Sequence, residues 1–202
     1  MDIRRSKLMW LFAFLLWVFA VAYGMTQVWV YEKTPGLTLQ APAQWPTQAP
    51  LARAPTTATL LLFVHPQCPC TKATIGELAV LMTHCHEKLI AYLFFLSPNG
   101  FLERWSEGFL WQEAEKIPGV HLFRDKDGEM ARRFNAVTSG QTLLYDRNGW
   151  LLFEGGITDS RGHRGDNPGR SAIQSLILQG HSDRKKTDVF GCVLFNKPMI
   201  RE

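Results

Sequence analysis

The chain has 202 residues, enough for one domain of ordinary size together with an N-terminal appendage. Its hydrophobic fraction of 46% and charged fraction of 20% are those of a globular protein and exclude a largely disordered chain. The formal net charge of +4 is small. It is not gathered into a basic stripe with stacking aromatic residues, so we expect no nucleic-acid partner.

The first predicted element is an N-terminal membrane-spanning helix. Basic residues among the first seven precede an apolar run that reaches Val30, and no charged residue falls between Lys7 and Glu32. At about 1.5 Å per residue this run spans roughly 30 Å, the hydrocarbon thickness of a bilayer. Basic residues ahead of such a segment stay in the cytoplasm. The sequence therefore predicts a single-pass anchor over residues 1–31 in the cell inner membrane, with the C-terminal domain in the periplasm.

A cleaved signal peptide is the alternative for this segment. Ala20-Val21-Ala22 has the small-x-small pattern that a signal peptidase prefers. However, the apolar run continues beyond it, and Trp29 and Tyr31 stand where an interfacial aromatic belt would lie. We favour the anchor. A buried core helix is a third alternative, but so long a run without charges is rarely found in one. The anchor and the cleaved signal peptide both place the domain outside the cytoplasm.

Residues 32–56 are rich in Pro, Ala, Gln and Thr, which predicts a linker that serves as a spacer or an N-terminal arm. From residue 57 to 202, short apolar runs alternate with helical patterns. Strands are predicted over 59–64, 89–96, 120–123, 142–145 and 150–153, and helices over 69–85, 102–117, 129–134 and 171–178. Asn148-Gly149 is a strong hairpin signal between the last two strands. This order predicts an α/β sheet covered on both faces.

A cysteine between the first strand and the following helix, with a later hairpin and helix, resembles the thioredoxin fold. We therefore predict an α/β, thioredoxin-like fold with an N-terminal transmembrane helix. Residues 63–71 (Phe-Val-His-Pro-Gln-Cys-Pro-Cys-Thr), 155–158 and 162–167 are similar to bacterial RedB-type thioredoxin-like proteins. The resemblance covers residues 57–195. It implies thiol-disulfide chemistry, as in membrane-anchored oxidoreductases, with a protein thiol or disulfide as partner and no cofactor.

Cys68 is the predicted nucleophile. As the N-cap of a helix, with Pro69 at the first helical position, its thiol would have a lowered pKa, because the helix dipole and unpaired amides favour the thiolate. Relatives usually carry Cys-x-x-Cys; Cys68 matches the first cysteine, and Thr71 stands in the place of the second. On a regular helix Cys70 would point roughly 200° away from Cys68, which would strain a bond between them.

A second departure from the family lies before the predicted strand 142–145. Thioredoxin-like proteins place a cis-proline before a threonine that faces the active cysteine. Here Gln141 precedes Thr142. That proline normally shapes the substrate groove, so its replacement argues against ordinary dithiol exchange.

Three other residues complete the predicted site. Cys192 lies in a tail that could fold back, so either Cys70 or Cys192 is the expected resolving thiol, although Cys192 could equally be a packed tail residue. His65 and His163 are candidate proton partners. His163 belongs to the polar segment 159–170, which is either a lid over the cysteines or a solvated loop.

Two other functions remain open. A copper or zinc site built from Cys68, Cys70 and His65 would use the same residues as ligands. A non-catalytic interaction domain would use the cysteines as small core residues. Cys85 lies about 22 Å along the helix from Cys70 and is predicted to be an ordinary helix-face residue despite its flanking histidines. We favour thiol-disulfide exchange or peroxide reduction through Cys68.

Overall fold

The computed structural model describes residues 3–101 and 105–195, with side chains from Ser6 onward. The chain divides into two compact units at the junction of Thr34 and Pro35. Each unit is described by itself.

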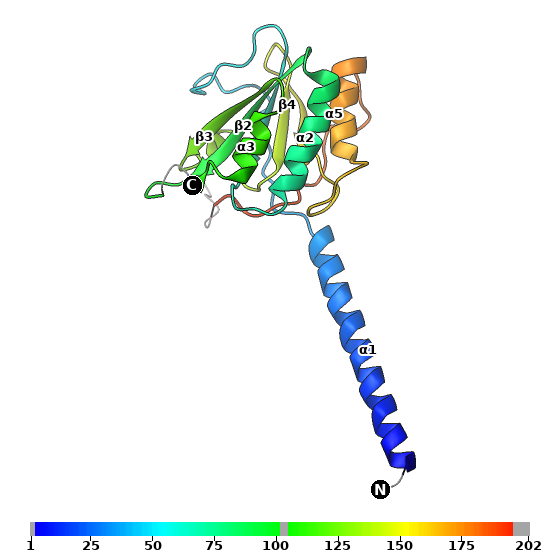
Figure 1. The fold of residues 1–202 in the computed structure, drawn as a ribbon. Coiled ribbons are helices and arrows are strands. Elements are labelled where there is room, and N and C mark those ends of the chain that lie inside the picture. The colour runs from blue at the N-terminus through cyan, green and yellow to red at the C-terminus, as the bar shows by residue number, and fades with distance from the viewer. Residues whose placement is uncertain (1–2, 102–104, 196–202) are drawn as a thin grey trace. The chain divides into compact units, whose positions relative to one another are not determined.

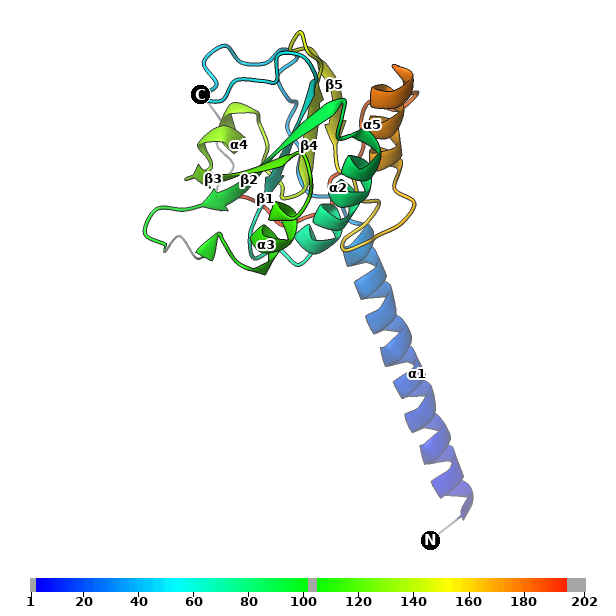
Figure 2. The same ribbon diagram turned by 45° about the horizontal axis from the view of Figure 1, so that its top comes forward.

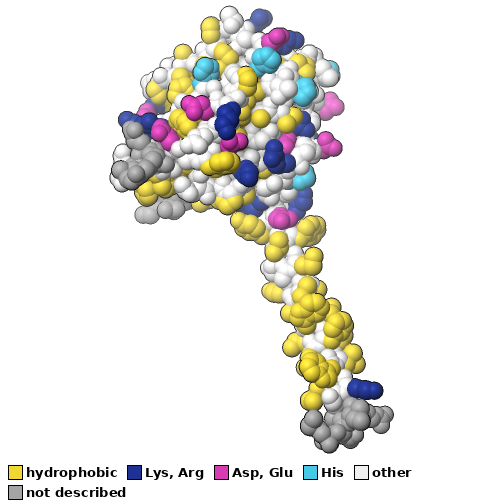
Figure 3. Space-filling view, viewed as in Figure 1, with side chains coloured by type: hydrophobic (Ala, Val, Ile, Leu, Met, Phe, Trp, Pro, Cys, Tyr) yellow, Lys and Arg dark blue, Asp and Glu magenta, His cyan; other side chains and the backbone are white. Residues whose placement is uncertain are grey.

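The N-terminal unit is one helix, α1 (Ile3–Lys33). Its segment Ser6–Lys33 is long and apolar enough to cross a membrane, by length and composition, although a signal sequence would meet the same criterion. Hydrophobic side chains cover the helix on the face shown in Figure 3. The hydroxyl of Thr26 donates to the Tyr23 carbonyl at 2.7 Å, so this polar group is satisfied within the helix.

The second unit is built on one five-stranded sheet with the order β3-β2-β1-β4-β5 (Figures 1 and 2). The strands are β1 (Ala58–Val64), β2 (Leu89–Ser97), β3 (Val120–Lys126), β4 (Gln141–Tyr145) and β5 (Leu151–Gly155). β1, β2 and β3 run parallel, whereas β4 is antiparallel to both β1 and β5. This arrangement confirms the predicted thioredoxin-like fold.

Helices cover both faces of the sheet. They are α2 (Thr71–Cys85), α3 (Phe109–Glu115), α4 (Glu129–Arg133) and α5 (Pro168–Gln179). α2, α3 and α5 lie on one face, and α4 lies on the other (Figure 2). β1 runs between them with both faces buried, which explains why its sequence is a nearly continuous apolar run.

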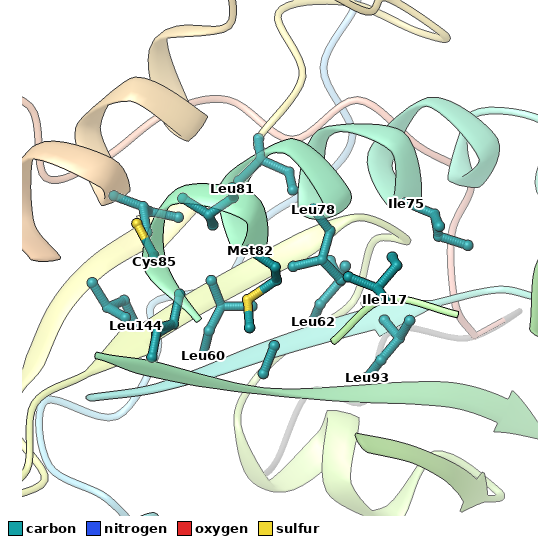
Figure 4. Close-up of a cluster of buried hydrophobic side chains, with 14 of the residues drawn as sticks. Leu60, Leu62, Ile75, Leu78, Leu81, Met82, Cys85, Leu93, Ile117 and Leu144 are labelled. Carbon is teal, nitrogen blue, oxygen red and sulfur yellow. The ribbon is translucent and has the colours of Figure 1, made fainter. Parts of the chain in front are cut away.

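The side chains of β1 alternate between two cores. Leu60 and Leu62 belong to the core beneath α2, α3 and α5, where Leu78 and Met82 of α2 point toward the strands (Figure 4). Phe63 belongs to the core beneath α4. The position of β1 in the middle of the sheet fixes the direction in which the chain leaves Val64 and enters the segment that carries Cys68.

The predicted helix over 102–117 begins too early, because residues 105–108 are not α-helical. Residues 102–104 lie outside the described residues, and α-helical structure begins only at Phe109. Gly108 precedes it as the N-cap with an extended backbone (φ −75°, ψ −163°), which is the non-helical conformation that an N-cap adopts.

Residues 35–55, which were expected to form a linker, pack against the second unit. Ala41 and Ala54 are buried, and the Trp45 ring packs edge-on against Phe134 and Tyr145 with centroids 5.1 Å and 5.3 Å apart. The Gly36 amide donates to the Val189 carbonyl at 2.8 Å. This arm therefore touches both the core beneath α4 and the C-terminal tail.

Candidate functional site

The segment between β1 and α2 is a tight turn that holds Cys68 ahead of the helix. The Cys68 amide donates to the His65 carbonyl at 3.0 Å, and the Thr71 amide donates to the Cys68 carbonyl at 3.1 Å. Helical bonding starts at the Cys70 carbonyl, so Cys70 is the N-cap. The expectation that Cys68 is the N-cap and Pro69 the first helical residue is therefore wrong by two positions.

Cys68 is almost completely buried, with 1% of its surface exposed, and its sulfur accepts several hydrogen bonds. The Cys192 amide donates to the Cys68 Sγ at 3.4 Å. Burial raises the pKa of the Cys68 thiol, but hydrogen bonds from the Cys192 thiol and amide, the Cys70 amide and the Thr71 hydroxyl outweigh it and lower the pKa. The thiolate is thus stabilised chiefly by donors from the tail.

Cys70 has the opposite tendency. Burial, the negative charge of Cys68 and a hydrogen bond to Cys68 raise the pKa of the Cys70 thiol, against the effect of Arg161. Cys70 therefore stays protonated at neutral pH, and Cys68 is the more acidic of the two thiols. This contact corrects the expectation that the two side chains point apart: neither residue lies within regular helix, so the helical angle between them does not apply.

Cys192 reaches the site because the C-terminal tail pairs with the segment before β4. Thr138 and Val193 form an antiparallel bridge, the Ser139 amide donates to the Cys192 carbonyl at 2.8 Å, and the Leu194 amide donates to the Val137 carbonyl at 2.9 Å. Burial, a hydrogen bond to Cys68 and the charge of Cys68 raise the pKa of the Cys192 thiol to about 12. The tail therefore folds back and brings Cys192 to Cys68, which is the first of the two alternatives predicted for this residue.

The tail is fixed in place by its own packing. Val189, Phe190 and Leu194 are buried. Gly191 lies so close to the backbone that a Cβ atom there would come within 1.9 Å of the Ser139 carbonyl oxygen. Burying a side chain of the size of Leu194 contributes about 1.5–3 kcal/mol. The packed tail therefore forms one side of the site.

A small hydroxyl cluster joins the turn to the segment before β4. The His65 amide donates to Ser139 Oγ at 2.9 Å, and the hydroxyls of Ser139 and Thr71 are 3.1 Å apart. Thr71 stands where Cys-x-x-Cys proteins have their second cysteine. Its hydroxyl connects Cys68 to Ser139, the residue whose amide donates to the Cys192 carbonyl of the tail. Sequence analysis did not single out Ser139.

The segment before β4 is shaped without a cis-proline, because the described residues contain no cis peptide bond. The Gln141 side chain accepts a hydrogen bond from the Val137 amide at 3.1 Å and donates to the Asn135 carbonyl at 3.4 Å. Gly140 adopts a left-handed backbone (φ +91°), and its amide donates to the Phe63 carbonyl at 2.7 Å. Gln141 and Gly140 together hold the segment beside Cys68.

Of the two predicted histidines, only His65 lies next to the cysteine turn. The Gln67 amide donates to His65 Nδ1 at 3.1 Å, and the ring packs edge-on against Trp105 at 5.5 Å. Burial lowers the pKa of His65, so the ring is neutral at neutral pH. His163 is exposed, and its backbone amide donates to the Ser160 carbonyl at 3.3 Å.

Arg161 is a site residue that sequence analysis missed. Its Nη1 donates to the Gly191 carbonyl at 2.7 Å, and it hydrogen-bonds the Cys70 thiol. The segment that carries it is held on α2 by the buried Glu77, which accepts a hydrogen bond from the Gly165 amide at 2.9 Å and pairs with Arg170 at 2.7 Å. No sequence pattern distinguishes Arg161 from the other arginines of this segment.

The alternative role for these residues is as ligands of copper or zinc. Within residues 3–101 and 105–195, no group of three or more His, Cys, Asp or Glu residues is placed to hold a metal ion. The Gln67 amide donates to His65 Nδ1, so this nitrogen already has a hydrogen-bond partner within the turn. Cys85 is buried in the core beneath α2, as predicted, and takes no part in the site.

Comparisons with known proteins support the fold and leave the function open. No protein family model and no curated protein matches the chain. An uncharacterized conserved protein from Geobacillus kaustophilus matches with 21% identity and a TM-score of 0.57, over 83% of this chain and 95% of that one.

Two further solved structures are more distant. A hypothetical protein from Sinorhizobium meliloti matches with 18% identity and a TM-score of 0.54, over 69% of this chain and 80% of that one. A secreted Mycobacterium tuberculosis disulfide oxidoreductase has 11% identity and a TM-score of 0.44, over 61% and 82% of the two chains. At these identities a likeness concerns the fold alone.

Proposed function

We propose that this protein carries out thiol-disulfide exchange with protein thiols or disulfides, with Cys68 as the nucleophile and Cys192 as the resolving thiol. The observation that carries this proposal is the hydrogen bond from the Cys192 amide to the Cys68 Sγ at 3.4 Å. It supports a thiolate at Cys68, which is the form of cysteine that attacks disulfides. It also brings the backbone of a second cysteine directly beside that sulfur.

In the reducing direction the Cys68 thiolate attacks one sulfur of a client disulfide. A mixed disulfide forms between Cys68 and the client, and the second client sulfur leaves as a thiolate that takes up a proton. Cys192 then loses its proton and attacks the Cys68 sulfur. This step forms the Cys68–Cys192 disulfide and releases the first client sulfur as a thiol. A separate dithiol partner returns the protein to its reduced state.

The pKa shifts favour this order of events. While Cys68 is an anion, it raises the pKa of the Cys192 thiol, so Cys192 does not compete as a nucleophile. Once Cys68 is in a mixed disulfide its negative charge is gone, and with it one cause of the raised pKa of Cys192. Arg161 further lowers the pKa of Cys192. Burial still raises the pKa of Cys192 after the first step, but the part of the increase that comes from Cys68 is removed.

Peroxide reduction through Cys68 remains a second prediction, since the same two cysteines would serve it. The thiolate would attack one peroxide oxygen and break the O–O bond, giving a sulfenic acid while the other oxygen leaves and takes up a proton as water or an alcohol. The sulfenic acid would then condense with the Cys192 thiol to a disulfide and water. No contact of the described residues favours a peroxide over a disulfide. We therefore retain disulfide exchange as the main proposal.

The thiolate at Cys68 can be measured directly. We expect the pH dependence of Cys68 alkylation to give a pKa below the value of about 8.5 for a free thiol, because the donors to Cys68 outweigh its burial. The measurement is iodoacetamide labelling across pH, read at Cys68 by tandem mass spectrometry. Cys85, whose pKa is raised by burial, is the internal control and should label slowly.

An ordinary pKa at Cys68 would contradict the redox proposal. Stoichiometric copper or zinc in the purified protein, lost in a Cys68→Ser variant, would instead establish the metal alternative. An ordinary Cys68 pKa in a protein without bound metal would leave a non-catalytic interaction domain as the remaining function.

We further propose that α1 anchors the domain to the inner membrane with residues 35–202 in the periplasm. The charge-free apolar run between Lys7 and Glu32 and the basic residues at its N-terminal end support this topology. A reporter fused after Glu202 should be active only outside the cytoplasm, and the full-length chain should stay in membranes after a carbonate wash. Cytoplasmic reporter activity would overturn the topology, whereas release of a shortened soluble chain would overturn only the anchor.

A further inference from the structure

The peptide group between Gly191 and Cys192 is held from both of its ends. Arg161 Nη1 donates to the Gly191 carbonyl at 2.7 Å, and the Cys192 amide of the same peptide group donates to the Cys68 Sγ at 3.4 Å. A trans peptide group is planar, with its C=O and N–H pointing in opposite directions. A cation bound at the carbonyl therefore lies on the far side of the peptide from the sulfur and aims the N–H at it.

We propose that Arg161 is a positioning residue that stabilises the Cys68 thiolate through the Gly191–Cys192 peptide group. This inference rests on the proposed role of Cys68 as the nucleophile. A charged donor at the carbonyl strengthens the bond and polarises the peptide, so the N–H becomes a better donor to the sulfur.

Arg161 is itself held in a defined position. The segment that follows β5 is closed at its base by Asn167, which is buried and accepts a hydrogen bond from the Asp159 amide at 2.7 Å. Farther along, Glu77 of α2 accepts from the Gly165 amide at 2.9 Å and pairs with Arg170. The buried carboxylate of Glu77 thus secures the segment that carries Arg161.

The Cys192 carbonyl makes a further backbone contact that restrains the Gly191–Cys192 peptide group. The Ser139 amide donates to the Cys192 carbonyl at 2.8 Å, and Gly191 packs directly on Ser139. Between Arg161 and Ser139, the Cys192 amide has little freedom to turn away from the Cys68 sulfur. The positive charge of Arg161 also favours the anionic form of neighbouring sulfurs, which is the direction of its effect on both Cys70 and Cys192.

Arginine variants test this role in the full-length protein. In Arg161→Gln we expect a higher Cys68 pKa and labelling by iodoacetamide at pH 7 that is about five- to tenfold slower, since the charge is removed. Arg161→Lys keeps the charge and should recover part of the rate. The matched control is Arg164→Gln, three residues along the same segment, where the guanidinium lies against Gly76 of α2 and away from the tail. It should leave the Cys68 pKa unchanged.

The outcomes separate this inference from the proposed function. An ordinary Cys68 pKa in the unmodified protein would overturn the proposed function. A lowered pKa that Arg161→Gln and Arg161→Lys both leave unchanged would overturn only the role of Arg161. If Arg161→Gln made Cys192 label as fast as an exposed cysteine, the arginine would serve to dock the tail, and the positioning role would be overturned. A raised Cys68 pKa with Cys192 still protected would support it.

Discussion

Replacing Cys68 by serine is expected to abolish disulfide exchange, with a loss of at least about 10³-fold in rate. A serine hydroxyl at this position can neither attack a sulfur atom to form a disulfide nor be deprotonated at neutral pH. The measurement is the reduction of a chromogenic mixed disulfide by the purified full-length protein in detergent, with a dithiol as the source of electrons. Hydrogen peroxide in the same assay tests the second substrate class.

The two other cysteines of the site supply matched controls. Cys192→Ser should trap the mixed disulfide on Cys68 and lower turnover by about tenfold or more, because the resolving thiol is gone. Cys70→Ser should reduce turnover less than threefold, roughly, since the pKa of Cys70 is raised and its thiol stays protonated beside Cys68. In the unmodified, oxidised protein we expect a Cys68–Cys192 bond on non-reducing peptide mapping.

A bond between Cys68 and Cys70 with Cys192 free would contradict the assignment of the resolving thiol. The protein would then be better understood as an oxidant or isomerase, because a disulfide between such close neighbours is strained and easily reduced. Four free thiols in protein isolated from an oxidising compartment would count against both pairings.

The second large effect is expected at Gly191. Gly191→Ser should destabilise the protein by about 2–4 kcal/mol, because the new Cβ would lie 1.9 Å from the Ser139 carbonyl oxygen and the rigid backbone cannot yield. Moving the tail would also remove the Cys192 amide from Cys68, so the Cys68 pKa should rise. The measurements are urea unfolding of the detergent-solubilised protein and the pH dependence of Cys68 labelling.

Gly108→Ser is the matched control for this substitution. A Cβ at Gly108 would meet nothing within 4 Å, its φ is −75°, and serine is a favoured N-cap. We expect its free energy of unfolding to change by less than about 0.5 kcal/mol. Equal losses in the two variants would show that the tail does not pack against Ser139 as described.

The parts of the fold that local patterns determine were predictable from the sequence. The apolar run of β1 follows from burial on both of its faces, and the placement of Cys85 in the core follows from the spacing of its helix face. The start of α2 was misplaced because Pro69 suits a first helical position, whereas the chain uses a turn closed by the Thr71 amide at the Cys68 carbonyl. A helix that starts at Pro69 and a turn that precedes the helix differ only in short-range hydrogen bonds, and the same residues are compatible with either.

The site itself depends on contacts that no local pattern encodes. The tail pairs with Thr138 through a single bridge instead of a full strand, so the sequence around Cys192 carries no alternation that would indicate it. Arg161 donates to the Gly191 backbone carbonyl. Every residue has such a carbonyl, so no sequence pattern could identify the partner of Arg161. The sequence points to Cys68 as the candidate nucleophile, whereas it does not indicate which groups donate hydrogen bonds to its sulfur.

The long separation between the two halves of the site has a consequence for the order of folding. Cys68 and Cys192 are 124 residues apart, and contacts of such separation form late because closing the loop costs entropy. At synthesis rates of about 5–20 residues per second, Cys192 follows Cys68 by on the order of ten seconds. Until the tail docks, Cys68 lacks the two donors that Cys192 supplies, its thiol and its amide. We therefore expect the pKa of Cys68 to fall below that of an ordinary thiol only at the last stage of folding, when the tail docks.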